Sequence, residues 1–279
     1  MHYLYLPTSW CRDRKLGSHS KVSISYGGDG SLIISPQVTE KKPKHLKFSI
    51  SEDDQNIIHK LVVALYINPA SSFEIILQKE MDFTKLLNQK RLISLESVEI
   101  DHKRITCEGP VSVVHPESLL KTMVKKIKNM MIVMEKNYDK ELIERYEDEI
   151  DRSKMLIDKA VISALMFEGT TKIRTIELYY ISLISKELER LVDGLFNLGK
   201  KDVKFLLELE KPIELLGTVV EHPEALTLEN ALGFAKAVSK IRERTAVDVR
   251  IYEMERMKQN LVTISEVIMD WMVTKKLEN

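Results

Sequence analysis

Cysteine is scarce in this chain of 279 residues, which contains only Cys11 and Cys107. The two are far apart and match neither the spacing of a zinc site nor that of a redox motif, so we expect reduced thiols. Long apolar runs are also absent, because no stretch approaches the ~18 residues that span a bilayer. The first residues, MHYLYLPTSW, lack the basic start and apolar core of a signal peptide. These absences predict a soluble cytoplasmic protein without membrane insertion.

Net charge is absent as well, since 42 lysine and arginine residues balance 42 aspartate and glutamate residues. This balance argues against a surface dominated by nucleic-acid contacts, although a local basic patch stays possible. The motifs of common enzymes are missing too: the chain has no P-loop, no GxGxxG after a strand and no nucleophile elbow. No acid–base or nucleophilic set is apparent. We therefore expect a protein that is not an enzyme.

The first part of the chain holds six of the eight prolines, all at or before Pro116. In it, KVSISY and SLIIS flank the glycine-rich GGDG at 27–30, which predicts a β-hairpin. TEKKPKH, around Pro43, is typical of a linker. We therefore predict a separate N-terminal hairpin domain over residues 1–40.

A small α/β domain is expected over residues 41–115. HLKFSI and SSFEIILQ predict strands, and SEDDQNIIHKLVVALYI, with a Ser51 cap and an acidic first turn, predicts a helix. DFTKLLNQKRLI predicts a short helix, and SVEI and RITCEG flank DHK like a second hairpin. The order β-α-β-α-β-β implies one sheet whose helices cover one face.

From Pro116 onward the apolar period becomes 3.6 residues, which predicts an all-α bundle over 116–279. Proline suits the first turn of a helix, so one helix should begin at Pro116. Further helices are expected over roughly 139–167 and 173–198, followed by about three more segments. Short connections between long helices imply antiparallel neighbours. The predicted fold class is α+β, a hairpin and a small α/β unit followed by a long helical bundle.

Two pairs of like charges stand one helical turn apart: Glu147 with Asp151, and Glu189 with Asp193. Each pair costs an isolated helix roughly 0.2–0.5 kcal/mol. If the two helices face each other, four carboxylates converge. Clusters of oxygen ligands suit hard cations such as Mg²⁺, Mn²⁺ or Ca²⁺, and they can also hold iron. A bound cation would remove the like-charge cost.

Ordinary surface ion pairs are the alternative explanation. Lys154 follows Asp151 by three residues and precedes Asp158 by four. It could therefore form ion pairs with much of the acidic strip that Glu147, Asp151 and Asp158 make along this helix. A ferritin-like di-metal centre is not expected, because no histidine stands in a Glu-x-x-His position on these helices. Both interpretations stay open at this point.

YEDEIDRSKMLI followed by ELERLVDGLFNL resembles the paired Glu-x-x-x-Asp signatures of PhoU-family helices. The resemblance covers residues 116–275 and implies two three-helix repeats, at about 116–199 and 200–279, in a regulator of phosphate uptake. The family's carboxylates can bind multinuclear metal clusters. The resemblance therefore implies iron or another divalent cation (Mn, Mg or Zn) at the four carboxylates of the first repeat. In the second repeat, Lys258 and Gln259 stand where an acidic residue is expected, so Glu255 lacks its partner and no cluster is implied there.

The front of the chain resembles the start of archaeal PhoU-like proteins, where a SpoVT/AbrB-type hairpin precedes the bundle. The matching residues are Leu6-Pro7-x-x-Trp10, Leu16-Gly17, Val22-x-Ile24 and Asp29-Gly30-Ser31-Leu32-x-Ile34-x-Pro36. The first strand is truncated to MHYLYLP, and Ser20-Lys21 replaces the family's Gly-Asp. Such hairpins normally swap with a second chain to form a dimer that reads DNA. We therefore expect a homodimer, with local positive charge only at Arg12, Arg14 and Lys15.

The resemblance implies a regulatory adaptor of phosphate uptake that contacts a phosphate transporter ATPase or a signalling protein. The alternative is an AbrB-type DNA-binding regulator whose bundle senses phosphate or metal. A third class is a scaffolding oligomer without a ligand. The zero net charge favours the adaptor over the DNA-binding regulator.

Overall fold

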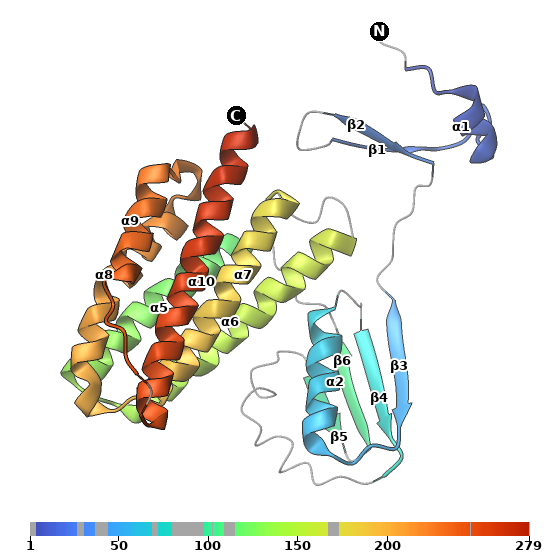
Figure 1. Ribbon diagram of the computed structural model, residues 1–279. Coiled ribbons are helices and arrows are strands. Elements are labelled where there is room, and N and C mark those ends of the chain that lie inside the picture. Colours follow the sequence, from blue (N-terminus) through green and yellow to red (C-terminus); the bar gives the residue numbers. More distant parts are fainter. Residues whose placement is uncertain are drawn as a thin grey trace. The chain divides into compact units, whose positions relative to one another are not determined.

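The computed structural model forms two compact units, Met1–Lys44 and His45–Asn279 (Figure 1). The residues it describes are 4–26, 31–36, 44–68, 72–79, 98–101, 103–108, 115–166, 173–245 and 247–278. Three sequence predictions lie wholly or partly outside them: the turn at 27–30, most of the linker around Pro43, and the short helix within DFTKLLNQKRLI.

The first unit contains the predicted hairpin and one short helix. Its elements are α1 (Thr8–Asp13), β1 (Ser23–Tyr26) and β2 (Leu32–Ser35). The strands pair antiparallel in the register that joins Ser23 to Ser35 and Tyr26 to Leu32. The hairpin prediction is therefore confirmed, whereas α1 was not predicted.

One face of this hairpin is apolar and open to solvent. Ile24 and Tyr26 on β1 lie beside Ile34 and Leu32 on β2, and Tyr26 is 82% exposed. A two-stranded sheet is only marginally stable by itself, and its edges offer unpaired backbone groups. The unit therefore has an apolar surface that a partner could bury.

The second unit begins with a four-stranded mixed sheet. Its elements are β3 (His45–Ile50), α2 (Gln55–Ile67), β4 (Ser72–Leu77), β5 (Val98–Asp101) and β6 (Arg104–Glu108). The strand order is β3-β4-β6-β5, in which β3 and β4 are parallel and the other neighbours are antiparallel. The crossover through α2 allows the parallel pairing, because parallel strands cannot be joined by a tight turn. The predicted strands and helix are confirmed here, and so is the second hairpin.

Helix α2 covers one face of this sheet (Figure 1). The pattern Ser-Phe-Glu-Ile-Ile-Leu in β4 turns Phe73, Ile75 and Leu77 toward Ile58 and Val62 of the helix. The predicted cap at Ser51 is wrong. Because the Glu52 carboxylate accepts the next two backbone N–H groups, the helix begins later, with Asp54 as its cap.

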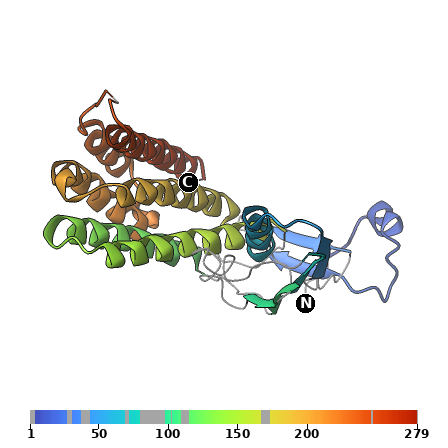
Figure 2. The same ribbon diagram turned by 90° about the horizontal axis from the view of Figure 1, so that it is seen from below.

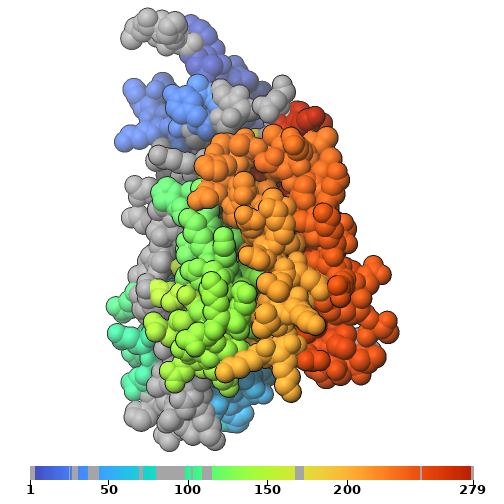
Figure 3. Space-filling view, turned by 90° about the vertical axis from the view of Figure 1, so that its left-hand side faces the viewer, coloured from blue at the N-terminus to red at the C-terminus, as the bar shows by residue number. Residues whose placement is uncertain are grey.

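Six helices make up the described part of the bundle. They are α5 (Pro116–Lys136), α6 (Lys140–Met166), α7 (Thr175–Phe196), α8 (Val203–Glu221), α9 (Leu228–Ser239) and α10 (Val249–Glu278). Helices α5, α6 and α7 pack together, α9 packs against α8 and α10, and α10 packs along α7 (Figures 1 and 2). Figure 3 shows the face on which α5 (green) and α8 (orange) lie side by side.

The predicted bundle is confirmed, and its first three helices lie within two residues of the expected positions. Their apolar stripes share one buried cluster with those of α8, α9 and α10. The two groups of three differ in length, since α9 has 12 residues where α6 has 27. The internal repeat therefore stays a prediction.

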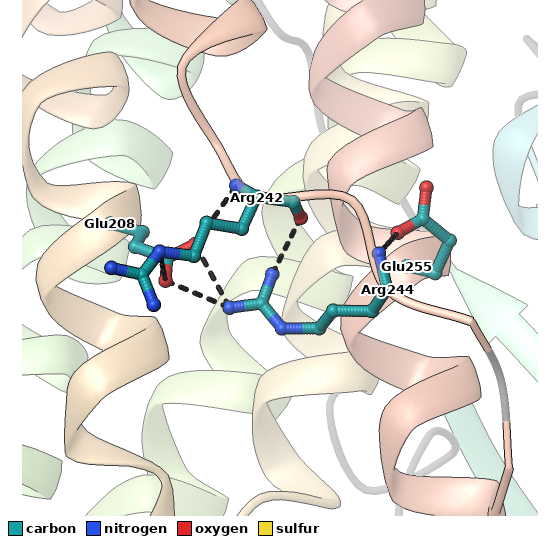
Figure 4. A network of polar contacts seen from close by, with 4 residues as sticks. All are labelled: Glu208, Arg242, Arg244 and Glu255. Carbon is teal, nitrogen blue, oxygen red and sulfur yellow. Dashed lines mark hydrogen bonds and ion pairs between the residues drawn. The ribbon is translucent and has the colours of Figure 1, made fainter.

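The connection from α9 to α10 is fixed by charged groups from two helices (Figure 4). The Arg244 guanidinium donates to both oxygens of Glu208 on α8, at 2.8 and 2.9 Å, and lies over the Phe205 ring. The backbone N–H of Arg244 donates to Glu255 on α10. Because charge-assisted contacts are among the stronger polar interactions, they tie Arg244 to both α8 and α10.

Helices α7 and α10 leave no room for a side chain at Gly194. A Cβ atom on Gly194 would lie 2.6 Å from Cγ and 2.9 Å from Sδ of Met257, which is fully buried. Both distances are well inside van der Waals contact. The absence of a side chain at this position is therefore what allows the two helices to pack.

We predict that Gly194→Ala lowers the free energy of unfolding by about 1–3 kcal/mol, because it overpacks this contact. The matched control is Gly233→Ala in α9, where nothing lies within 4 Å of the added methyl group. That change should stabilise the protein by roughly 0.5–1 kcal/mol through helix propensity. Urea unfolding of both variants measures the difference. Equal stabilisation by the two changes would contradict the prediction.

Candidate metal centre

Three of the four predicted carboxylates come together. Asp151 on α6 and Glu189 and Asp193 on α7 each offer one oxygen, and these oxygens lie within 4.8 Å of one another. We call these three residues the acidic triad. Glu189 and Asp193 share one edge of α7 because they are one turn apart.

Glu147 is not part of this group, although it is half-buried on the same helix. It precedes Asp151 by four residues, which is about 6 Å along the helix axis. The sequence pattern could not separate these two positions, because both lie on the same acidic strip of α6.

The triad lies at a partly buried position. Asp151 is 9% exposed, and Glu189 and Asp193 are half-buried. Their helices are fixed by the fully buried neighbours Ile150 and Leu188. Bringing three carboxylates together away from bulk water is costly unless positive charge compensates them.

A cavity of ≈ 250 Å³ lies beside the triad, between α6, α7 and α2. Asp151 and Glu189 line it, together with Lys154 and, from the α/β domain, His59 and Lys60. A water molecule takes about 30 Å³ of liquid volume, so the space admits a cation with part of its hydration shell. Sequence reasoning missed α2 as a wall of this cavity, since nothing in its pattern signals a contact with helices about 90 residues away.

The ligand chemistry of the triad fits a hard cation. Carboxylate oxygens are the usual ligands of Mg²⁺ and Mn²⁺ and can hold iron, whereas structural zinc sites favour nitrogen and sulfur. Three side-chain oxygens and water molecules in the cavity would complete a coordination shell. The triad could therefore hold a metal ion, with Mn²⁺, Mg²⁺ and iron better suited to it than zinc.

The alternative of ordinary ion pairs is correct for part of the strip. Lys154 Nζ lies 2.8 Å from Asp158 Oδ2, an i,i+4 pair in which both side chains are half-buried. Lys154 also lines the cavity that contains Asp151. A lysine therefore already supplies positive charge near the triad, and a cation that binds there must do so beside it.

Glu255 on α10 is held by contacts other than a metal cluster. Glu255 accepts a hydrogen bond from the Arg244 backbone (Figure 4). It also accepts one, at 3.4 Å, from Gln259. Lys258 is buried and pairs with Glu243 at 3.6 Å. Across the described ranges, no group of three metal-ligating side chains other than the triad comes together.

Comparison with protein-family models, with curated proteins and with solved structures finds no match for this chain. The helices that the structure describes include none with the length and apolarity needed to cross a membrane.

We predict that Mn²⁺ or Fe²⁺ stabilises the fold and that a chelator reverses the effect. A site that binds only the folded state adds about 2.7 kcal/mol at a hundredfold excess over Kd. Replacing both Asp151 and Asp193 by asparagine should abolish this gain, and the metal-free double variant should be no less stable than the metal-free wild type, because repulsion is relieved. Thermal melts and elemental analysis measure both effects.

Two single changes serve as controls for this experiment. Asp158→Asn removes the pair with Lys154 and should cost less than about 1 kcal/mol without affecting the metal response. Glu147→Gln should also leave the response intact, because Glu147 lies outside the triad. If the melting temperature of the wild type is the same with metal and with chelator, the site does not exist.

Proposed function

We propose that this protein is a cation-responsive regulator of phosphate uptake that acts through protein–protein contacts rather than catalysis. The observation that carries the proposal is the convergence of Asp151, Glu189 and Asp193 on two adjacent helices of a bundle. The resemblance of their sequence motifs to those of PhoU helices supplies the link to phosphate.

The side chains that line the cavity beside the triad are carboxylates, lysines, one histidine and apolar groups. They offer oxygen ligands for a cation and positive charges close to it. A cation bound there would neutralise the triad and favour the arrangement in which α6 and α7 are close together.

A shallow groove between α5 and α8 offers a surface for a partner. It exposes Ile132 (41%) and Leu207 (51%), and Lys128 and Glu210 lie beside them. Exposed apolar side chains with a polar rim are typical of protein interaction sites. The proposed partner is a phosphate transporter ATPase or a signalling protein.

The first functional test is affinity purification from cells grown with high and with low phosphate. We expect the wild type to capture a phosphate transporter ATPase or a phosphate-signalling protein, with at least a several-fold difference between the two conditions. The Asp151→Asn, Asp193→Asn double variant should lose this difference, whereas Asp158→Asn should keep it. Identical partners in both media, without any protein of phosphate transport, would contradict the proposal.

The apolar face of the β1–β2 hairpin supports a homodimer. We expect light scattering at micromolar concentration to give about twice the chain mass of 32.2 kDa, because a second copy buries Ile24, Tyr26 and Leu32. Removing residues 1–40 should shift the mass toward the monomer. A full-length monomer would refute the dimer, and nanomolar sequence-specific binding of the protein's own promoter in a gel shift would favour the DNA-binding alternative.

A further inference from the structure

A buried lysine joins the bundle to the α/β domain. Lys159 on α6 is only 6% exposed, and its Nζ donates a hydrogen bond of 2.7 Å to the backbone oxygen of Tyr66 on α2. The same nitrogen lies 4.6 Å from the centre of the Tyr66 ring. One ammonium group thus makes two contacts with one residue of a different domain.

The backbone oxygen of Tyr66 is available to an outside donor because it lies in the last turn of α2. Tyr66 is the last residue but one of α2, and the last four carbonyls of a helix have no partner within it. The helix dipole also makes this end negative, which favours a cation. Lys159 therefore caps α2 from another domain.

The surroundings of Lys159 compensate its charge only in part. Among the described residues, the titratable groups beside it are Tyr66 of α2 and Cys107 of β6, and Arg152 of α6 also acts on Tyr66; none of the three supplies a negative charge at neutral pH. Within the described part of the chain, Lys159 forms no ion pair with a carboxylate. Burial accordingly lowers the pKa of Lys159 and raises those of Cys107 and Tyr66.

Few apolar contacts reinforce this joint. Met155 is the buried residue that α6 contributes to the core of the α/β domain, and Leu156 packs at its edge. Ile58 and Val62 of α2, by contrast, belong wholly to the α/β core. Among the described residues, α6 thus meets α2 and its core through Met155, Leu156 and Lys159, with Arg152 acting electrostatically on Tyr66.

We infer that α2 is a detachable cover, joined to α6 through a latch at Lys159 that holds less firmly when Lys159 is charged, and that its position sets how far the cavity beside the acidic triad is open. Helix α2 supplies five of the nine residues that line this cavity, among them His59 and Lys60. Asp151 is 9% exposed and Glu189 is half-buried with α2 in place, so moving α2 away would increase the exposure of both. The inference goes beyond the proposed function and holds whether the cavity contains a cation or only water.

The sign of the pH dependence follows from linkage. The pKa of Lys159 is below its ordinary value of 10.5 when α2 is latched, so the open form binds more protons in the interval between the two values. Closure is therefore weakest below the lowered pKa and strengthens as pH rises toward 10.5. Each unit by which closure lowers the pKa corresponds to a change of up to tenfold in the closing equilibrium.

Hydrogen exchange of α2, corrected for the intrinsic rate at each pH, tests the latch in the full chain. We expect protection of α2 in the wild type to increase between pH 7 and 10. Lys159→Met should make it independent of pH. Lys159→Arg, whose charge cannot be lost, should leave α2 less protected than in the wild type across the range. Lys126→Met, which removes a half-buried lysine paired with Glu149, should behave like the wild type.

Modification of His59 by diethyl pyrocarbonate tests the cover. In Lys159→Arg, His59 should react faster than in the wild type. The ratio of the two rates should equal the factor by which the same variant lowers the hydrogen-exchange protection of α2. The exposed His222 should react equally in both proteins. Protection of α10 reports whether each variant is folded. If the protection of α2 in the wild type does not change with pH, the latch is overturned. This measurement needs no variant. An unchanged His59 rate with faster α2 exchange would overturn the cover.

Discussion

The arrangement of this protein depends on helix α6, which is buried on two opposite sides. Taking Ile150 as the reference, a rotation of about 100° per residue places Ile157 within about 20° of it, and Met155 and Lys159 at about 140–180°. Ile150 and Ile157 lie in the core of the bundle, whereas Met155 lies in the core formed by α2 and the sheet. A single helix thus belongs to two hydrophobic cores.

The position of the acidic triad is a consequence of this double burial. Asp151 lies at about 100° on the same scale, between the side that faces the bundle and the side that faces α2. It is therefore withdrawn from solvent between the bundle and α2, although it belongs to neither hydrophobic core. A carboxylate in such a position needs compensating charge. Lys154 and Lys60 line the adjoining cavity, and a divalent cation would supply more charge than either.

The two parts of the second unit are joined by contacts of very different strength. The helices of the bundle share a continuous core that includes large, fully buried side chains such as Phe205 and Phe234. The joint between α2 and α6 instead relies on an ammonium group that is held by a carbonyl and a ring. Burial of a charge with incomplete compensation lowers the stability of the closed joint relative to an apolar contact. Local opening should therefore concentrate at this joint, while the bundle itself stays folded.

The sequence by itself determined the elements that depend on local patterns. Alternation around the glycine-rich turn specified the strands at 23–26 and 32–35, and the 3.6-residue period from Pro116 specified the first three bundle helices to within about two residues. It also singled out Asp151, Glu189 and Asp193, because like charges one turn apart are conspicuous. Only the tertiary structure decided that Glu147 lies outside their group, that α2 forms a wall of the cavity, and that Lys159 caps this helix. Periodicity fixes the face of a helix on which a residue lies. The residues that meet that face are fixed by packing between segments up to about 100 residues apart, which no local pattern records.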